Sequence, residues 1–162
     1  MRKTIIGVMG PGAGATEKDK KNAYELGKAI AQKGWVLLSG GRYQGVMDAV
    51  SHGAQDAGGL VVGILPSKDG SDASKAVDIR IVTAMGGARN VINVLSSDVV
   101  VTCGMGAGTS SEVGHSVKVG KPTILLGTGK KAEAFFKEIA PELVYTAKNV
   151  NETIDLIKKL LK

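Results

Sequence analysis

The chain has 162 residues, a length that suits one domain with a proper hydrophobic core. Hydrophobic residues make up 43% of it, which excludes an intrinsically disordered chain, and aromatic residues make up only 4%, which argues against a stacking platform for single-stranded nucleic acid. The formal net charge is +6, and many of the lysines fall in two helical stretches, residues 18–33 and 158–162. We expect a single domain over residues 1–162 with these charges on exposed helix faces; the alternative is a basic field that attracts anionic small molecules.

The single cysteine, Cys103, excludes an intramolecular disulfide, and its place at the end of an apolar strand predicts a buried thiol. No cysteine and histidine set has the spacing of a metal site, so we expect no metal ligands. The apolar run near the N-terminus is too short for a signal peptide, and no segment is apolar over a length that could span a bilayer. The sequence therefore predicts a cytoplasmic protein with no membrane partner.

Short β-branched runs alternate with helical patterns along the whole chain. Thr16 is the expected N-cap of the first helix and Gly34 the residue that ends it. Polar residues 67–76 are expected to form a mobile surface loop, a candidate lid. The expected strands are residues 5–9, 35–39, 60–65, 78–83, 98–103, 123–126 and 143–146, and the expected helices are residues 17–33, 45–57, 88–96, 108–119, 132–139 and 150–161.

This alternation predicts βαβ units and an α/β fold. We expect a Rossmann-like three-layer sandwich, in which a mostly parallel sheet of about seven strands is flanked by helices. Ligands in such folds bind at the carboxyl ends of the strands, near a topological switch point. Four glycine clusters fall at those ends: residues 10–14, 40–41, 86–87 and 104–108.

The most informative glycine cluster follows the expected strand 98–103 and opens into a helix. Glycines allow close backbone approach to a ligand, and the free N–H groups and dipole of a helix start favour an anion such as phosphate. Glu112 lies one turn into that helix, where it would repel phosphate, so we expect it to contact another part of the ligand, such as a ribose or a water. The ligand contacts expected from this cluster are Gly104, Gly106, Gly108, Thr109 and Ser110, the last being a helix-start residue and not a nucleophile.

The other clusters supply further candidate contacts: Gly10, Gly12, Gly40 and Gly41. The first cluster resembles a phosphate-binding turn, with a plain tight turn as the alternative. It is not a dinucleotide fingerprint, because no acidic residue closes the second strand, and a nicotinamide-dependent enzyme is therefore not expected.

Arg89 stands at the expected start of a helix, where the helix dipole disfavours a cation. An anionic partner, either a phosphate or Glu112 across the pocket, would explain its position. Asn90 follows it as a candidate ligand contact, and Met85 is expected to line the pocket wall or the core. His52 and His115 fall inside helices and are expected to be surface or packing residues, and no Ser-His-Asp arrangement is present.

Three units of this sequence, in this order, resemble the LOG-like superfamily, whose members were once labelled lysine decarboxylases. The family signature Pro-Gly-Gly-x-Gly-Thr-x-x-Glu is matched from Gly106 to Glu112, with Gly104 and Met105 in place of the leading Pro-Gly. The family's Arg-Lys pair corresponds to Arg89 and Asn90, and its Gly-Gly-x-x-x-Gly-x-Met element corresponds to Gly40 and Gly41 with residues 45–47. Residues 45–50, 58–66 and 88–90 resemble most the molybdenum-cofactor-carrier-like branch.

The resemblance implies a glycine-rich pocket for a phosphorylated nucleotide-like or pterin ligand, in a carrier or storage protein of the molybdenum cofactor. The alternative that it implies is a phosphoribohydrolase, which cleaves nucleoside 5′-monophosphates to free base and ribose 5-phosphate. In that alternative Glu112 and Arg89 are the catalytic residues, and the glycine loop with Thr109 holds the phosphate. No cofactor is required for this chemistry; a molybdopterin-type cofactor or a nucleoside monophosphate is the expected ligand.

The same resemblance implies a homodimer or homotetramer. A nucleic-acid-handling protein of the related DNA-processing type is the least favoured reading, since it would need further domains or a focused basic groove. Lysine decarboxylation is excluded, because a pyridoxal cofactor needs a lysine beside its phosphate site and no lysine lies next to a suitable glycine loop.

Overall fold

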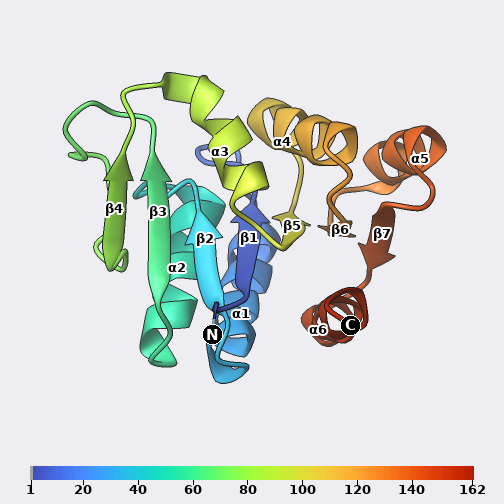
Figure 1. The fold of residues 1–162 in the computed structure, drawn as a ribbon, viewed down its shortest axis with the longest axis horizontal. Helices are drawn as coiled ribbons and strands as arrows, with labels where there is room; N and C mark the ends of the chain where they lie inside the picture. The colour runs from blue at the N-terminus through green and yellow to red at the C-terminus, as the bar shows by residue number, and fades with distance from the viewer. Residues whose placement is uncertain (1) are drawn as a thin grey trace.

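The computed structural model of the protein describes residues 2–162. Within them, strands and helices alternate in the order that the sequence predicts (Figure 1). The strands are β1 (Ile5–Met9), β2 (Val36–Ser39), β3 (Val61–Leu65), β4 (Ile79–Val82), β5 (Val99–Cys103), β6 (Thr123–Leu126) and β7 (Val144–Ala147). The helices are α1 (Glu17–Gln32), α2 (Gly45–Asp56), the 3₁₀ helix η1 (Gly86–Arg89), α3 (Asn90–Leu95), α4 (Ala107–Lys118), α5 (Lys130–Ile139) and α6 (Val150–Leu160).

All seven strands form one parallel sheet in the order β4-β3-β2-β1-β5-β6-β7. The chain starts in the middle at β1, moves outward to β4, and returns to the other side of β1 at β5. The direction of winding therefore reverses between β1 and β5, which is the topological switch point where ligands bind in such sheets.

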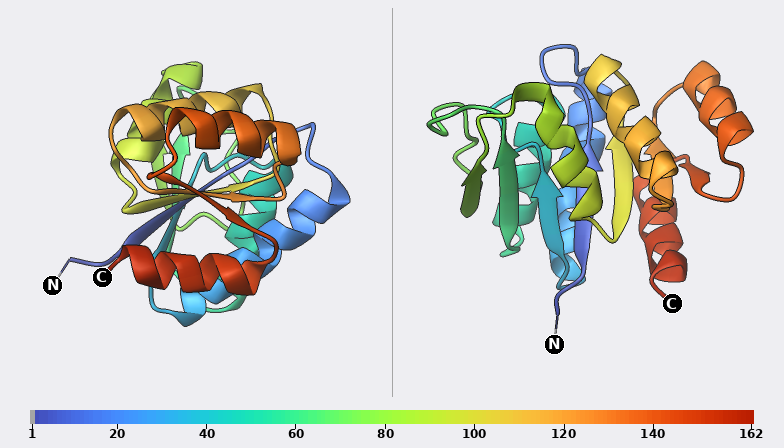
Figure 2. Two further views of the ribbon diagram at one scale, coloured as in Figure 1. Left: turned by 90° about the vertical axis from the view of Figure 1, so that its right-hand side faces the viewer. Right: turned by 45° about the horizontal axis from the view of Figure 1, so that its top comes forward.

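Helices cover both faces of the sheet, as Figure 2 shows edge-on. Helices α1, α2 and α6 lie on one face, with α3, α4 and α5 on the other. The main core lies under α1, α2 and α6, and includes Ile6, Leu26, Leu37, Val101 and Ile154. The predicted α/β three-layer fold is confirmed. None of the helices in residues 2–162 is both long enough and apolar enough to cross a membrane.

Local sequence signals explain where the first helix begins and ends. The hydroxyl of Thr16 accepts from the backbone N–H of Asp19 at 3.1 Å, and the Asp19 carboxylate accepts from the N–H of Thr16 at 2.9 Å. This capping box supplies partners for N–H groups that the helix itself leaves free. Gly34 follows the helix with a φ of +69°, a left-handed conformation that suits glycine. Both predicted ends are thus confirmed to within a residue.

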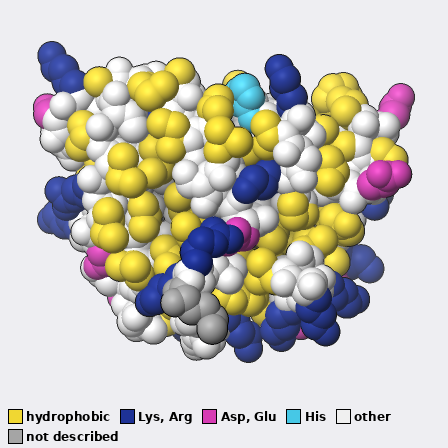
Figure 3. Space-filling view, in the orientation of Figure 1, with side chains coloured by type: hydrophobic (Ala, Val, Ile, Leu, Met, Phe, Trp, Pro, Cys, Tyr) yellow, Lys and Arg dark blue, Asp and Glu magenta, His cyan; other side chains and the backbone are white. Residues whose placement is uncertain are grey.

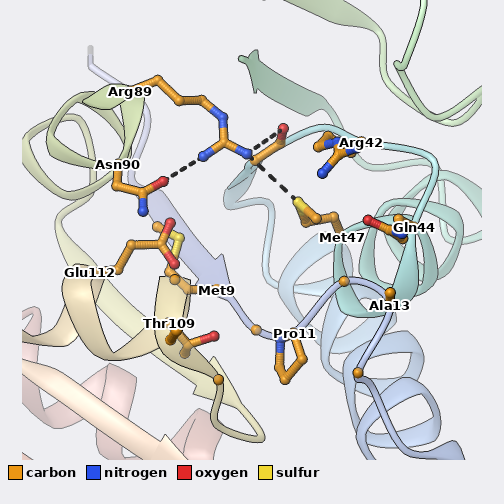
Figure 4. Close-up of a pocket in the computed structure, with 17 residues that line it drawn as sticks. Met9, Pro11, Ala13, Arg42, Gln44, Met47, Arg89, Asn90, Thr109 and Glu112 are labelled. Carbon is orange, nitrogen blue, oxygen red and sulfur yellow. Dashed lines mark hydrogen bonds between the residues drawn. The ribbon is translucent and has the colours of Figure 1, made fainter. Parts of the chain in front are cut away.

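The expected helix 88–96 is divided in the structure. Its first part is the 3₁₀ turn η1, which begins at Gly86, and α3 continues from Asn90. The backbone is strained just before this turn: Ala84, two residues before Gly86, has a φ of +55°, and Gly86 has the same φ. This turn redirects the backbone so that Arg89 faces the carboxyl ends of the strands (Figure 4).

Helices α1 and α2 approach closely because each has a glycine at the contact. A Cβ on Gly27 would lie 2.9 Å from the backbone nitrogen of Ala54 and even closer to the carbonyl oxygen of Val50. A Cβ on Gly53 would collide with the carbonyl oxygen of Tyr24. Both obstacles are backbone atoms, so neither can move aside without separating the helices.

We therefore expect Gly27→Val to lower the free energy of unfolding by about 1–3 kcal/mol, the usual cost of overpacking. Gly114→Ala is the matched control: Gly114 is an exposed residue within α4, and a Cβ there meets no atom within 4 Å. Its replacement should raise stability by up to about 1 kcal/mol through helix propensity. Urea denaturation of both variants would check this, and an unchanged midpoint for Gly27→Val would contradict the close helix contact.

Candidate functional site

The candidate site is a pocket at the carboxyl ends of β1, β2 and β5, at the switch point of the sheet (Figure 4). Its volume is about 380 Å³, within the range typical of small-molecule sites. The sides come from the loop after β1, the loop between β2 and α2, the junction of η1 with α3, and the start of α4. The lining consists of Met9, Gly10, Pro11, Gly12, Ala13, Gly14, Gly40, Arg42, Gln44, Met47, Arg89, Asn90, Gly106, Ala107, Gly108, Thr109 and Glu112.

Glycines let these loops pack directly over the strand ends. A Cβ on Gly10 would lie 2.6 Å from the carbonyl oxygen of Cys103, and one on Gly40 would lie 2.7 Å from Nη2 of Arg89. By contrast, a Cβ on Gly108 would meet no atom within 4 Å. Gly10 is therefore required for packing against the backbone, a side chain at position 40 would displace Arg89 or Met47, and Gly108 leaves open space at the start of α4.

The start of α4 supplies hydrogen-bond donors to this space. Its N-cap, Gly106, has an extended conformation and makes no side-chain cap hydrogen bond. The first backbone N–H groups of a helix have no partner within the helix, and together with the helix dipole they favour an anion. The Thr109 side chain is buried, and its Oγ1 has no hydrogen-bond partner within residues 2–162. This combination offers hydrogen-bond donors of the kind that an anionic group requires.

Arg89 is the buried cation of the pocket, with only 7% of its surface exposed. Its Nη1 donates to Oδ1 of Asn90 at 2.5 Å, and its Nη2 donates to the carbonyl oxygen of Gly40 at 3.5 Å, while Nε has no partner in the described chain. Among the described ion pairs none includes Arg89. Burial lowers the pKa of the guanidinium, but arginine remains charged at neutral pH. A buried charge without an ion-pair partner is costly, so an anionic ligand would relieve the cost.

Glu112 lies on α4 one turn after Gly108, and 6% of its surface is exposed. The Asn93 amide donates to its Oε1 at 3.0 Å. Burial raises the pKa of Glu112 to about 7, against the smaller opposing effects of the Asn93 hydrogen bond and the positive charge of Arg89. The carboxyl therefore changes its charge close to neutral pH, inside the pocket. The predicted direct pairing of Arg89 with Glu112 is not among the ion pairs of the described residues, although the two charges influence each other.

Asn90 connects the two sides of the pocket. Its Oδ1 accepts from Arg89, and its Nδ2 donates to the hydroxyl of Ser111 on α4 at 3.0 Å. Asn90 therefore orients the guanidinium and ties α3 to the helix that presents Glu112.

The structure brings most of the predicted contacts into the lining: Gly10, Gly12, Gly40, Arg89, Asn90, Gly106, Gly108, Thr109 and Glu112. Gly41 lies outside it because its φ of +71° turns it toward the backbone of Gly63. Gly104 has a φ of +76° and faces the Asp19 carboxylate, where a Cβ would collide.

Two other predicted contacts also lie outside the lining. Ser110 points away, with its hydroxyl 3.2 Å from the sulfur of Met105, and Met85 is a half-exposed residue before η1. Cys103 is buried as predicted, and burial raises the pKa of its thiol to about 12. His52 does have a neighbour in sequence, since its Nε2 lies 3.6 Å from Oδ1 of Asp48, one helical turn earlier.

Sequence reasoning missed three side chains that line the pocket: Arg42 and Gln44 from the loop after β2, and Met47 from α2. Met47 is buried, and its sulfur lies 3.9 Å from Nη2 of Arg89. Arg42 is held by an ion pair with Asp72 at 3.0 Å. The sequence did contain a signal for Arg42 and Gln44, because a cationic and an amide side chain follow the glycine pair 40–41 at the end of a strand.

The polar segment 67–76, predicted as a mobile loop, is fastened to the loop after β2. The N–H of Tyr43 donates to the carbonyl oxygen of Asp72, and the N–H of Ser74 donates to that of Gly41, each at 2.8 Å. Ser74 is also fully buried, and its hydroxyl donates to Asp48 at 2.6 Å. This segment therefore forms a fixed wall near Arg42. Within residues 2–162 no group of histidine, cysteine or carboxylate side chains could hold a metal ion.

Comparison with known proteins shows a family resemblance that covers nearly the whole chain. The model of the SLOG cluster4 family matches residues 3–154. The chain belongs to the SLOG cluster4 family. The predicted LOG-like relationship is thereby confirmed. Two similar structures, described next, also confirm the predicted resemblance to the molybdenum-cofactor-carrier-like branch.

The structure of the molybdenum cofactor binding protein from the phototrophic bacterium Rippkaea orientalis is 54% identical in sequence, with a TM-score of 0.98, and the match covers 100% of this chain and 99% of that one. The molybdenum cofactor carrier protein from Chlamydomonas reinhardtii is 50% identical, with a TM-score of 0.95, over 99% of both chains. A cytokinin riboside 5′-monophosphate phosphoribohydrolase from Mycobacterium tuberculosis is 46% identical, but only over 44 residues, 27% of this chain and 24% of the enzyme.

Proposed function

We propose that this SLOG cluster4 protein binds the molybdenum cofactor, a phosphorylated pterin that carries the metal, and serves as its carrier or store. The observation that carries the proposal is the buried, unpaired guanidinium of Arg89 across the pocket from the free start of α4. Two separated anion-binding positions suit a ligand with anionic groups at both ends. The similarity to two molybdenum cofactor proteins over the full chain supports the same ligand class.

The remaining lining fits a pterin ring. Met9, Met47 and Pro11 offer apolar surface, and the amides of Gln44 and Asn90 offer the donors and acceptors that a pterin edge requires. The unpartnered Thr109 hydroxyl and the backbone N–H groups of Ala107 and Gly108 would bind the phosphate. In this arrangement the protein holds the ligand by noncovalent contacts and releases it unchanged.

Anaerobic titration with the molybdenum cofactor, followed by gel filtration, tests the proposal. We expect a stoichiometric complex in which molybdenum and pterin fluorescence elute with the protein. Thr109→Val, which keeps the shape of the side chain and removes the hydroxyl, should weaken the complex, whereas Ser110→Ala should not, because Ser110 points out of the pocket. Elution of the protein without molybdenum or pterin would contradict the proposal.

The second candidate is phosphoribohydrolase activity on nucleoside 5′-monophosphates. One observation favours it: Glu112 and Arg89, the residues that the family resemblance marks as catalytic, both line the same pocket. An ionised Glu112 beside an anomeric carbon would stabilise the positive charge that develops when a glycosidic bond breaks. The local match to a phosphoribohydrolase is short, so we rank this activity second.

Incubation with a panel of nucleoside 5′-monophosphates, followed by chromatography for free base, decides between the candidates. If the protein is a carrier, no base should be released from any of them. Base release that disappears in Glu112→Gln, while the variant still binds the nucleotide, would instead identify a hydrolase.

We also propose that the protein is a homodimer or homotetramer in the cytoplasm. Figure 3 shows hydrophobic side chains over the sheet face formed by β3 and β4, which the short α3 leaves uncovered. Ile79 and Ile81 of β4 are 46% and 43% exposed, and Leu95 of α3 is 54% exposed. An exposed apolar face of this kind is typical of subunit contacts. Light scattering should give a multiple of the 16.7 kDa chain mass, and a monomer mass would contradict the assembly. Cell fractionation would test the proposed cytoplasmic location.

A further inference from the structure

A second cavity opens beside the main pocket. Its volume is about 510 Å³, and it extends toward Pro66, Ser67 and Asp72 on one side and toward Gly86 and Gly87 on the other. We call it the side pocket. It shares Arg42, Arg89, Asn90 and Gly108 with the main pocket, so the two spaces are continuous around these residues.

The side pocket has more positive than negative charge. Arg42 and Arg89 both line it, whereas Asp72 is the carboxylate in its lining. Asp72 accepts from Nε of Arg42 at 3.0 Å and from the hydroxyl of Ser67 at 2.5 Å, so its oxygens are already occupied. Burial is the main cause that lowers the pKa of Arg89, Glu112 and Asp72 oppose it, and the positive charge of Arg42 lowers the pKa further because the two cations repel each other. An anion between them would remove that repulsion.

The cations of the side pocket also have free hydrogen-bonding capacity. Nε of Arg89 is buried and has no partner in residues 2–162, and no described hydrogen bond involves Nη1 or Nη2 of Arg42. Planar guanidinium groups bind two oxygens of one oxyanion side by side. Facing them, Gly86 and Gly87 present only backbone, and a Cβ on either would meet no atom within 4 Å. The space next to the cations is therefore open to a group with several oxygens.

We propose that the side pocket receives the oxo–molybdenum end of the cofactor, while its phosphate lies at the start of α4 in the main pocket. This inference rests on the proposed function, and it assigns an orientation to the ligand. The metal end carries oxygen acceptors and negative charge, which match Arg42 and Arg89. The phosphate end matches the backbone donors and the Thr109 hydroxyl on the far side of the main pocket. Binding of the metal end would then depend on Arg42, whereas the phosphate would be held by the backbone N–H groups at the start of α4 and by Thr109.

Binding of the cofactor and of metal-free molybdopterin to the same variants tests this orientation. Arg42→Gln should weaken binding of the molybdenum-containing cofactor at least tenfold and change binding of metal-free molybdopterin less than twofold. Gly87→Leu should give the same selective loss by filling the side pocket, and it leaves the Arg42–Asp72 ion pair intact. Lys75→Gln is the matched control, because it removes a positive charge from the exposed part of the 67–76 segment and lines neither pocket.

The outcomes separate the two proposals. Selective loss of the metal-containing form in both variants would support the orientation. Equal loss of both forms, loss of the metal-free form alone, or no loss in either variant would overturn it while leaving the carrier function in place. Failure of the unmodified protein to bind either form would overturn the carrier function and the orientation together.

Discussion

Replacement of Arg89 by methionine should weaken binding of phosphate-bearing pterin ligands by about 1.5–3 kcal/mol, the range for a hydrogen bond to a charged group. That corresponds to a loss of roughly ten- to a hundredfold in affinity. Methionine has a similar length and no charge, so it removes the guanidinium and keeps most of the packing against Gly40 and Met47. Calorimetric titration would measure the change.

The same substitution should affect stability in the opposite way. In the protein without ligand, Arg89 is buried with no ion-pair partner among the described residues, and its desolvation opposes folding. We therefore expect the free energy of unfolding of Arg89→Met to be equal to or higher than that of the unmodified protein. A residue kept for function at some cost in stability gives this pattern. If the variant unfolded more easily and bound ligand unchanged, Arg89 would be structural.

Arg89→Lys distinguishes charge from geometry. Lysine keeps the positive charge but lacks the planar group that contacts Asn90 and the Gly40 carbonyl together. We expect it to recover only part of the lost affinity. Full recovery would indicate that charge alone matters at this position.

The fold could be predicted closely because its signals are local. β-branched runs marked the strands, Thr16 and Gly34 marked the ends of α1, and alternation of strands with helices implied a parallel sheet. The division of η1 from α3 could not be predicted in this way. It depends on how Ala84 and Gly86 turn the chain with a positive φ after the edge strand β4, which is a tertiary constraint.

The candidate site was predictable where a glycine loop joins a strand to a helix, and less so elsewhere. Gly41 and Gly104 have the same sequence signature as Gly40 and Gly106, yet their positive φ values turn them toward Gly63 and Asp19 instead of the pocket. Nothing local distinguishes the two kinds of glycine.

The contribution of Arg42 was hidden for a similar reason. Its position is set by Asp72, which is 30 residues away in sequence and belongs to a polar loop that looked mobile. A contact between two loops has no periodic pattern, so only the fold reveals it.

Glu112→Gln should stabilise the protein above neutral pH by on the order of 3 kcal/mol, because each unit of pKa shift corresponds to about 1.4 kcal/mol. The pKa of Glu112 is about 7 in the folded protein, against 4.5 for an ordinary glutamate. Between these values the folded protein keeps a proton that the unfolded chain has lost, so stability falls as pH rises from 4.5 to about 7 and stays low above it. Glutamine avoids this loss and can still accept from Asn93 through its carbonyl oxygen.

Urea denaturation at pH 5 and pH 8 would measure the effect. The two proteins should differ little at pH 5, where Glu112 is protonated in the folded state, and should differ most at pH 8. A difference that is the same at both pH values would show that the carboxyl is not desolvated. Glu138→Gln on α5 is a suitable control, since it makes the same chemical change at an exposed position.

The same titration should govern ligand affinity. An ionised Glu112 repels an anion in the pocket, so affinity for a phosphate-bearing ligand should fall as pH rises through 7, and Glu112→Gln should remove that part of the fall. The ligand's own phosphate titrates near pH 6, but it does so equally with both proteins, and the difference between them isolates Glu112. Parallel pH profiles for the two proteins would mean that the carboxyl lies too far from the bound anion to influence it. A carrier with the predicted profile would bind its cargo through Arg89 and release it more readily wherever the pH exceeds 7.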